Sequence, residues 1–301
     1  MRRLTSKLLD RVLVLGVTGM LGSTIFRAFS ADEGFETFGT LRDPKGLKHF
    51  TPEQREMIIT NVAATGEADM ARAFSTSQPD IVINCVGIIK QLPSANDHLE
   101  SLAINSVLPH RIANYCAMVG ARLIHFSTDC VFSGATGRYV ESDRADAYDL
   151  YGRTKWLGEV DYENAITLRT SIIGHELASA HSLIDWFLSQ STDVKGYRRA
   201  IFSGLPTIEV SSVLRDFVIP NPQLRGLYHL SVDPISKLDL LTLVANTYKK
   251  KIKIVPDEEV AIDRSLNSDR FRSATGFAPK PWVQLVEEMH RDFQSNLEGQ
   301  C

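Results

Sequence analysis

Short apolar runs alternate with longer amphipathic stretches over the first half of the chain. Six runs have the length and composition of buried strands, and they cover Val12–Leu15, Phe35–Leu41, Met57–Ile59, Asp80–Asn84, Arg122–Phe126 and Ala165–Arg169. Between the fourth and fifth runs, apolar residues at helical spacing predict a helix over about Asp97–Val119. Apolar strands separated by helices are typical of a parallel sheet covered on both faces. The pattern therefore predicts an α/β fold with a doubly wound parallel sheet of the Rossmann type.

The second half of the chain has a less regular pattern. Helices are expected over Ser182–Ser191, Lys237–Tyr248 and Trp282–Phe293, and prolines interrupt the segments between them. We expect a Rossmann domain over residues 1–170, to which later segments return. A smaller α/β lobe is expected over residues 171–301.

A glycine-rich segment follows the first predicted strand directly and opens a helix. Its sequence is Gly16-Val17-Thr18-Gly19-Met20-Leu21-Gly22, with the spacing GxxGxxG. Glycines here permit a tight turn, a close approach of the backbone to a pyrophosphate, and close packing of helix on strand. The helix N-terminus then faces the phosphates. The segment therefore predicts a dinucleotide site, and a purely structural turn is the alternative.

Arg42 lies twenty positions after Gly22, at the end of the second predicted strand. An acidic residue at this place binds the ribose 2′-hydroxyl of NAD, whereas an arginine suits the 2′-phosphate of NADP. The sequence thus favours NADP(H) over NAD(H). Asp43 is adjacent and weakens the preference, and Arg42 as a plain surface residue is the alternative.

A tyrosine and a lysine stand four positions apart in Tyr151-Gly152-Arg153-Thr154-Lys155, on one face of a helix. Thr128 ends the fifth predicted strand, where ligands of doubly wound sheets bind. We expect the Lys155 ammonium to stabilise the Tyr151 phenolate and lower its pKa. The three side chains suit proton transfer to or from an oxygen on a carbon that exchanges hydride with a nicotinamide.

Composition excludes several classes of function. The 301 residues are 44% hydrophobic and 23% charged, with a net charge of −3, which gives no reason to expect nucleic acid or a membrane surface as partner. The apolar runs are shorter than a membrane span, and the charged Asp10 and Arg11 come soon after the basic start, so no signal peptide is expected. Cys85, Cys116, Cys130 and Cys301 are widely spaced without a CxxC. We therefore expect a cytoplasmic protein without disulfides and without a metal site.

These motifs together resemble the extended short-chain dehydrogenase/reductase superfamily, and within it the dTDP-4-dehydrorhamnose reductases and their sugar-nucleotide relatives. The resemblance covers nearly the whole chain and is strong through Ser171. The matching segments are Gly16–Gly22, Phe126–Phe132, Tyr151–Lys155 with Gly158-Glu159, and Leu168–Ser171, with weaker matches at Gly204–Thr207 and Arg264–Ser268.

The resemblance implies a role for each matching position. Tyr151 would donate the proton, Lys155 would hold the nicotinamide ribose and tune Tyr151, and Thr128 would orient the substrate carbonyl. The turn Asn84-Cys85-Val86-Gly87 would lie against the cofactor. Asn61-Val62 would lie by the adenine, although relatives usually have an aspartate at the place of Asn61. Asn105 would lie near the backbone of the active site, or would be an ordinary polar residue of its helix.

The residues after Thr128 indicate which type of reaction and which substrate to expect. The related 4,6-dehydratases follow Thr-Asp with a glutamate, whereas Cys130 follows Asp129 here, so a dehydratase is disfavoured. The rhamnose reductases usually have an aromatic residue at the place of Cys130 and a tryptophan at that of Ile172, and both contact the sugar. A different sugar or nucleotide is therefore expected. Trp186 would supply another wall of the substrate site, or would belong to the core.

The leading hypothesis is an NADP(H)-dependent reductase of a nucleotide-linked 4-keto-6-deoxysugar, with the C-terminal lobe binding the substrate. His175 and His181 are weaker candidates for substrate contact. An epimerase of the same superfamily remains open, because it needs only the tyrosine, the lysine and a tightly held cofactor. A cofactor-binding regulatory subunit also remains open, since the superfamily contains the regulatory subunit of methionine adenosyltransferase. A homodimer is possible.

Overall fold

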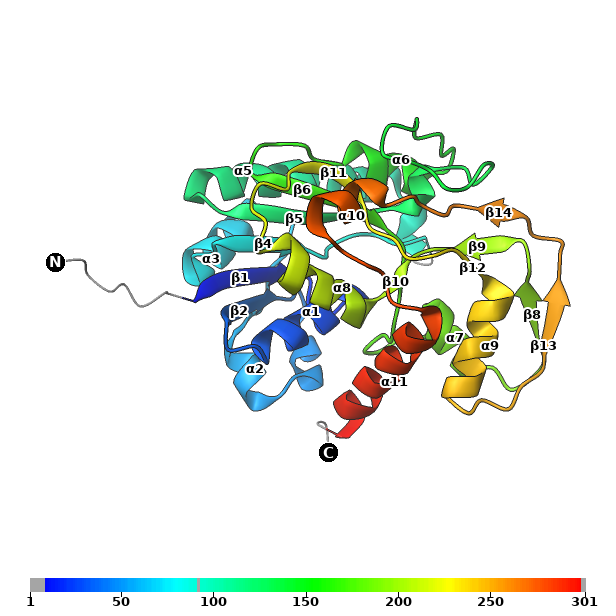
Figure 1. Cartoon of the computed structure of the whole chain (residues 1–301). Helices are drawn as coiled ribbons and strands as arrows, with labels where there is room; N and C mark the ends of the chain where they lie inside the picture. Colours follow the sequence, from blue (N-terminus) through cyan, green and yellow to red (C-terminus); the bar gives the residue numbers. More distant parts are fainter. Residues whose placement is uncertain (1–8, 91–92, 299–301) are drawn as a thin grey trace.

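A seven-stranded parallel sheet is the centre of the computed structural model, which describes residues 9–90 and 93–298 (Figure 1). The strand order is β11-β6-β5-β4-β1-β2-β3, and all neighbouring strands are parallel. The strands are β1 (Asp10–Leu15), β2 (Phe35–Thr40), β3 (Ile58–Ile59), β4 (Ile81–Asn84), β5 (Arg122–Thr128), β6 (Ala165–Thr170) and β11 (Gly226–His229). The six predicted strands are confirmed, and so is the Rossmann-type α/β class.

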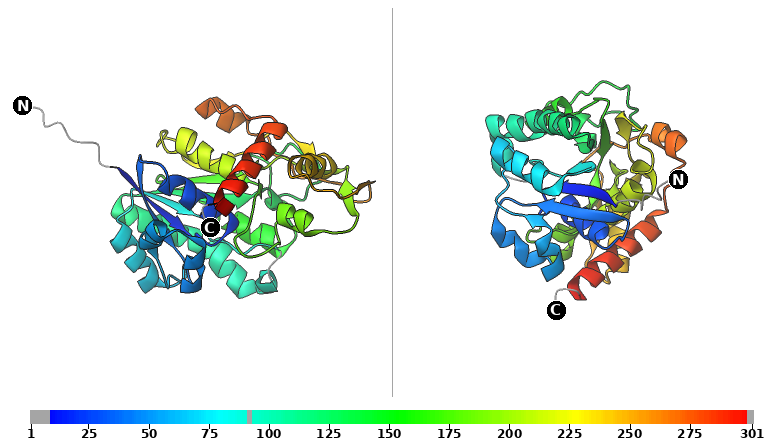
Figure 2. Two further views of the ribbon diagram at one scale, coloured as in Figure 1. Left: turned by 90° about the horizontal axis from the view of Figure 1, so that it is seen from below. Right: turned by 90° about the vertical axis from the view of Figure 1, so that its left-hand side faces the viewer.

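Helices cover both faces of this sheet, as the end-on view of Figure 2 shows. Val12 and Val14 of β1 belong to the core under α1 (Met20–Ser30), α8 (Thr207–Val213) and α10 (Asp269–Thr275). Leu13 and Leu15 belong to the opposite core, under α3 (Glu67–Ser77) and α5 (Leu108–Val119). All four side chains are fully buried. Burial on both faces explains why Val12–Leu15 of β1 is a continuous apolar run.

The helix predicted over Asp97–Val119 is present, but its middle is widened. It consists of α4 (His98–Ser101), the π-helical segment η3 (Leu102–Val107) and α5. Pro109 lacks an N–H, so the carbonyl of Asn105 has no ordinary helical donor four residues on. A Cβ at Gly158 would collide with this carbonyl. Glycine is therefore required where the segment after α6 (Leu150–Leu157) meets η3.

The residues after Thr170 build several small sheets and also complete the main one. β11 was not predicted, because it is only four residues long and follows Pro220 and Pro222. Three predicted helices are present, and residues of all three help to form a third core. These helices are α7 (Leu183–Ser189), α9 (Lys237–Thr247) and α11 (Trp282–Glu298). The small sheets contain β7 (Ile172–Ile173), β8 (Val194–Tyr197), β9 (Ala200–Phe202), β10 (Leu205–Pro206), β12 (Ile235–Ser236), β13 (Ile254–Asp257) and β14 (Ile262–Asp263).

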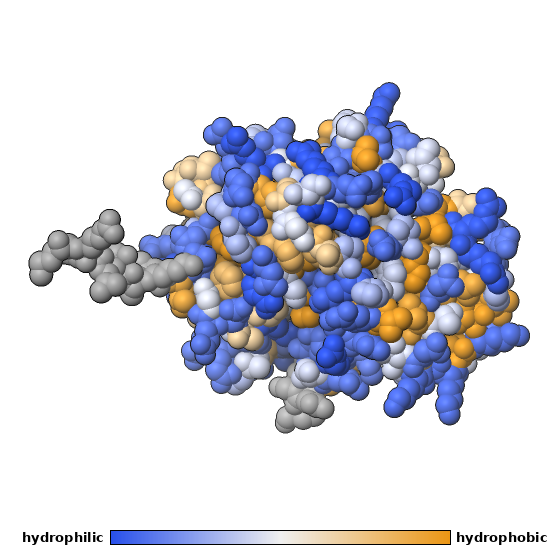
Figure 3. All heavy atoms as spheres, viewed as in Figure 1, coloured by the Kyte–Doolittle hydropathy of each residue, from blue (hydrophilic) through white to orange (hydrophobic). Residues whose placement is uncertain are grey.

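The remaining elements are short. They are η1 (Pro44–His49), α2 (Pro52–Glu56), η2 (Pro93–Asn96), η4 (Asp129–Val131) and η5 (Leu214–Val218). On the face drawn in Figure 3, polar residues predominate and apolar residues form smaller patches. Within the two described ranges, no helix is long and apolar enough to cross a membrane. The basic start of the chain and Cys301 lie outside the described residues.

Candidate active site

The glycine loop leads from β1 into α1 and has the geometry of a phosphate-binding turn. Gly16 has a φ of 82°, which L side chains rarely adopt. A Cβ at Gly22 would collide with the carbonyl oxygen of Gly16. Gly19 is the N-cap of α1 and supplies no capping side chain, and the first turn contains no acidic residue. The N–H groups at this helix end are therefore available to an anion.

Three further residues of the loop were expected to bind the cofactor. Leu21 is 7% exposed and belongs to the core, so its side chain is turned away from the loop. Met20 is partly buried at the first helical position. Thr18 lines a cavity of about 260 Å³ beside the loop. Leu21 can therefore contact a phosphate through its backbone but not through its side chain.

Several basic side chains that follow β2 in the sequence line this cavity. Arg42, Lys45, Lys48 and His49 line it together with Thr18. Asp43 also lines it, but its carboxylate accepts the N–H of Lys45 at 3.0 Å and caps η1. The carboxylate of Asp43, next to Arg42, therefore forms its hydrogen bond within its own turn.

Asn61 and Val62, which were expected near an adenine, follow β3 and lie beside the end of β2. The N–H of Val62 donates to the carbonyl of Leu41 at 3.0 Å, and the Val62 side chain is 5% exposed. Asn61 is exposed, with a φ of 55°, and its carbonyl accepts a hydrogen bond from Arg72 at 2.7 Å. Of this pair, only the Asn61 side chain is exposed, and Val62 belongs to the core.

The turn after β4 lies directly against the glycine loop. The Cys85 N–H donates to the carbonyl of Leu15 at 3.1 Å. A Cβ at Gly16 would stand 2.9 Å from Cγ2 of Val86, and one at Gly22 would stand 3.2 Å from Cβ of Cys85. Close contact between the two turns therefore depends on glycines 16 and 22.

Asn105 braces the far end of the β4 turn. Its Oδ1 accepts the N–H of Ile88 at 2.9 Å, and its Nδ2 donates to the carbonyl of Ile88 at 3.1 Å. A Cβ at Gly87 would lie 3.5 Å from the same Oδ1. Asn105 is 1% exposed. It is therefore not an ordinary polar helix residue, because it links η3 to the backbone at the edge of the site.

Tyr151 and Lys155 lie on successive turns of α6, which begins at the N-cap Asp149. The carboxylate of Asp149 accepts the N–H of Gly152 at 2.7 Å. A Cβ at Gly152 would collide with the carbonyl of Cys130, so glycine lets α6 approach the end of β5. Lys155 is 7% exposed, and its Nζ donates to the carbonyl of Phe126 at 2.7 Å.

Burial controls the protonation of this pair. Burial raises the pKa of Tyr151, nearby Cys130, Asp129 and Asp149 act in the same direction, and a hydrogen bond with Thr128 opposes them. This direction is opposite to the lowered pKa expected from the sequence. Burial also lowers the pKa of Lys155 to about 8, against the opposing charges of Glu159 and Cys85. Tyr151 is therefore a neutral phenol at neutral pH.

Thr128, Asp129 and Cys130 form the turn that faces Tyr151. The Thr128 hydroxyl accepts the N–H of Cys130 at 3.1 Å and donates to Asp129 at 3.2 Å. Burial raises the pKa of Asp129, while Arg264 and hydrogen bonds from its neighbours lower it. Burial raises the pKa of Cys130 to about 11, so its thiol is protonated at neutral pH.

Ile172 and Trp186, the other residues expected at the substrate, come from later elements. Ile172 is half-buried in β7, which follows β6 after one residue and pairs with β10. Trp186 is 39% exposed on α7, while Ile184 and Phe187 of that helix are fully buried. Trp186 is therefore not a core residue, and a substrate contact by its indole stays a prediction.

Sequence reasoning assigned no role to two cations near the Thr128–Cys130 turn. Lys90 pairs with Asp149 at 2.8 Å, and its Nζ lies 5.4 Å from the centre of the Tyr151 ring. Nε of Arg264 donates to the carbonyl of Phe132 at 2.8 Å, and its charge lowers the pKa of Asp129. Arg264 belongs to a weak family match, whereas Lys90 lies in a loop without any motif.

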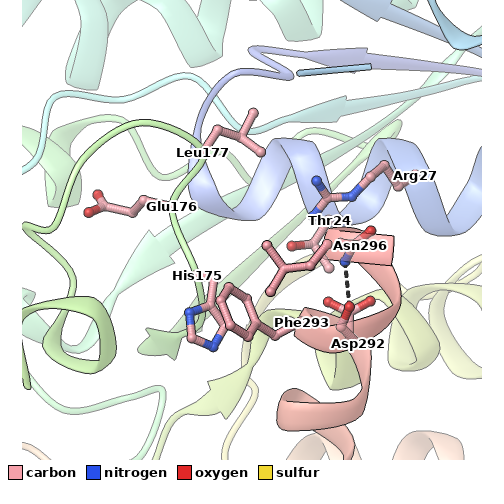
Figure 4. Close-up of a pocket in the computed structure, with 9 residues that line it drawn as sticks. Thr24, Arg27, His175, Glu176, Leu177, Asp292, Phe293 and Asn296 are labelled. Atoms are coloured by element: carbon pink, nitrogen blue, oxygen red, sulfur yellow. Dashed lines mark hydrogen bonds between the residues drawn. The ribbon is translucent and has the colours of Figure 1, made fainter. Parts of the chain in front are cut away.

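Of the two loop histidines, only His175 has a side chain held by contacts within the described residues. His175 contacts Asp185 through Nδ1 at 2.5 Å and the Tyr248 hydroxyl through Nε2 at 2.8 Å, and it stacks on Phe293. Figure 4 shows His175 and Phe293 together at a cavity of about 110 Å³ between α1 and α11. The backbone N–H of His181 donates to Glu176 at 2.7 Å, and a substrate contact by its exposed side chain stays a prediction. In the part of the chain that the structure describes, no three His, Cys, Asp or Glu side chains form a metal-binding group.

Comparison with known proteins gives a family match over most of the chain. A family model described as "RmlD substrate binding domain" matches residues 10–295. Methionine adenosyltransferase 2 subunit beta of Xenopus tropicalis is 24% identical over 293 residues, covering 90% of this chain and 78% of that protein. dTDP-4-dehydrorhamnose reductase of Mycolicibacterium smegmatis is 42% identical over 154 residues, covering 50% of this chain and 40% of that protein.

Solved structures share the fold. dTDP-4-dehydrorhamnose reductase from Bacillus anthracis in complex with NADP has a TM-score of 0.76 at 18% identity, covering 95% of this chain and 99% of that one. The Bordetella bronchiseptica enzyme WbmG in complex with NAD and UDP has a TM-score of 0.77 at 17% identity, covering 97% and 96%. Both structures hold nicotinamide cofactors on this fold.

Proposed function

Because the chain belongs to the RmlD substrate binding domain family of NAD(P)-dependent short-chain dehydrogenase/reductase enzymes, we propose that it is an NADP(H)-dependent reductase of a nucleotide-linked 4-keto-6-deoxysugar. The observation that carries this proposal is the meeting of three features at the carboxyl edge of one sheet. These are the glycine loop after β1, Thr128 at the end of β5, and Tyr151 with Lys155 on α6.

The chemistry of these residues suits reduction. A bound dihydronicotinamide would supply hydride to the keto carbon. Tyr151 would then donate its phenolic proton to the oxygen of that carbon, and Thr128 would hold the same oxygen. The phenol of Tyr151 is neutral at neutral pH, which is the form that can act as the donor. Lys155 would bind the ribose next to the nicotinamide.

A preference for NADP(H) is supported by the basic cavity beside the glycine loop. Arg42, Lys45, Lys48 and His49 line it, and a 2′-phosphate would bring a matching negative charge. The competing acidic residue, Asp43, caps η1 instead. The glycine loop, Asn61, Val62 and the turn Cys85–Gly87 would hold the rest of the cofactor.

The substrate site would lie between the β5 turn and the residues after Thr170. Cys130 and Ile172 stand where related rhamnose reductases usually have aromatic side chains, so the sugar contacts must differ. We therefore propose a sugar or nucleotide other than that of dTDP-4-dehydrorhamnose, with Trp186 as one wall. A cytoplasmic enzyme, a possible homodimer and the absence of nucleic-acid partners remain predictions.

The test is a titration with NADPH and NADH, followed by NADPH oxidation against a panel of nucleotide-linked 4-keto-6-deoxysugars. Tight NADPH binding with oxidation on one sugar is expected. Binding without oxidation on any sugar would contradict the reductase proposal. The absence of binding to either cofactor would contradict the interpretation of the glycine loop.

Two alternatives rest on the comparisons. One structural neighbour holds NAD and UDP, which keeps an epimerase open, and a cofactor that stays bound and is not consumed would favour it. A methionine adenosyltransferase subunit matches 90% of this chain, which keeps a regulatory subunit open. The presence of Thr128, Tyr151 and Lys155 argues against that role. A stoichiometric partner enzyme without sugar reduction would favour it.

A further inference from the structure

A buried histidine on β5 contacts the turn that faces the glycine loop. His125 is 1% exposed and lies beside Asn84, also 1% exposed, at the register position opposite it on β4. Nδ1 of His125 is 3.1 Å from Nδ2 of Asn84. The proposed reaction assigns this histidine no role, although its neighbour Phe126 accepts the hydrogen bond from Lys155.

The hydrogen bonds of Asn84 determine which ring nitrogen of His125 carries the proton. Oδ1 of Asn84 accepts the N–H of Val86 at 3.1 Å, so the amide group facing His125 is the NH₂. An amide nitrogen only donates, so Nδ1 of His125 must accept. A neutral imidazole then has its proton on Nε2. Burial, together with the charges of Lys155 and His110, lowers the pKa of His125 well below its ordinary value and keeps the ring neutral.

The Nε2–H group has no hydrogen-bond partner among the residues that the structure describes. Burying a donor without a hydrogen-bond partner is unfavourable. A side chain that served only packing at this position would be apolar, as Leu123 is two residues earlier on the same strand face. The unpartnered Nε2–H destabilises the folded protein, and the hydrogen bond between Nδ1 and Asn84 offsets this loss.

That contact acts on the wall of the proposed cofactor site. His125 fixes Asn84, and Asn84 holds the N–H of Val86. Val86 lies so close to the glycine loop that a Cβ at Gly16 would be 2.9 Å from its Cγ2. A change in the orientation of Asn84 would therefore move the turn toward or away from the glycine loop.

We propose that His125, as the neutral tautomer with the proton on Nε2, is a positioning residue that sets the Cys85–Gly87 turn against the glycine loop. It acts through Asn84 and does not touch the cofactor. This inference rests on the proposed function only in requiring that a nicotinamide dinucleotide occupies the loop.

The first test is nitrogen NMR of the cofactor-free protein labelled with ¹⁵N in its histidine rings. The spectrum of His125→Gln identifies the signals of His125 by their loss. We expect an unprotonated Nδ1 and a protonated Nε2 throughout the neutral pH range. A proton on Nδ1, or a doubly protonated ring, would overturn the inference regardless of any enzymatic activity.

The second test compares two variants. His125→Leu removes the acceptor, whereas His125→Gln keeps a side-chain oxygen that can accept from Asn84. We expect the Leu variant to raise the Kd for NADPH about tenfold and the Gln variant less than about threefold. The kcat at saturating NADPH should change less than about twofold in both, because the groups around Tyr151 remain in place.

Thr167→Val is the matched control. Thr167 is buried opposite His125 on β6, and its hydroxyl contacts only the backbone of Val160 among the described residues. We expect this variant to lose stability while its Kd for NADPH stays unchanged. An equal rise of Kd in Thr167→Val and His125→Leu, or no rise in His125→Leu, would contradict the positioning role. A wild-type protein that binds no nicotinamide cofactor would contradict the proposed function instead.

Discussion

Lys155 should make the protein less stable at neutral pH than at alkaline pH. Its side chain is 7% exposed, and burial lowers its pKa from the ordinary 10.5 to about 8. At neutral pH the ammonium is charged in both the folded and the unfolded state, and the folded state bears the cost of burying it. Between about pH 8 and 10.5 the folded protein loses this proton while the unfolded chain keeps it. The unfolded state then binds more protons, so the free energy of unfolding rises with pH.

The size of the effect follows from the two pKa values. A difference of about 2.5 pH units corresponds to about 3 kcal/mol at full extent, of which about 2–3 kcal/mol is reached by pH 10. Lys155→Met lacks this contribution but also loses the bond from Nζ to the Phe126 carbonyl, worth about 1.5–3 kcal/mol. The two effects nearly cancel at pH 7. The pH dependence of the difference between wild type and variant is therefore the informative quantity.

The assay is urea unfolding of the cofactor-free protein at several pH values and constant ionic strength. The free energy of unfolding of wild type minus that of Lys155→Met should rise by about 2–3 kcal/mol between pH 7 and 10. Lys251→Met, at an exposed lysine, is the control and should show no such rise. A difference that stays constant or falls with pH would refute the buried, charged ammonium.

Three further outcomes are expected at the site. Tyr151→Phe should lower kcat by about two to four orders of magnitude and leave the Kd for NADPH nearly unchanged; an unchanged kcat would remove Tyr151 from the mechanism. Arg42→Ala should weaken NADPH about tenfold and leave NADH binding unchanged, as measured by titration with both cofactors. Gly158→Ala should lose about 2–3 kcal/mol in urea unfolding, because its Cβ collides with the Asn105 carbonyl; wild-type stability would show that this contact relaxes freely.

The sequence predicted most of the sheet because its strands are buried on both faces. Strands β1 and β4 contain continuous apolar runs that can be recognised without knowledge of their neighbours. β11 was missed because it is short and follows two prolines. It pairs with β6, which lies far earlier in the sequence, so local sequence patterns do not reveal the pairing. The π-helical turn before Pro109 was equally invisible, since periodicity only indicates a helix.

The site was predictable where its residues lie in compact motifs. The glycine loop and the Tyr151/Lys155 pair combine local spacing with a position at the end of a strand. Lys90 has no such signal, because only the folded chain brings it near Tyr151. The direction of the Tyr151 pKa was wrong for the same reason, since the burial that raises it cannot be read from neighbours in the sequence.

The late return of β11 to the central sheet has a consequence for protein synthesis. All six residues of β6 are buried, and β11 covers one side of that strand. A nascent chain of which only the first 170 residues have emerged contains six of the seven strands and leaves β6 as an unpaired edge. Such an edge can pair with the edge of another nascent chain. A truncation after Thr170 should therefore aggregate rather than yield a separate half.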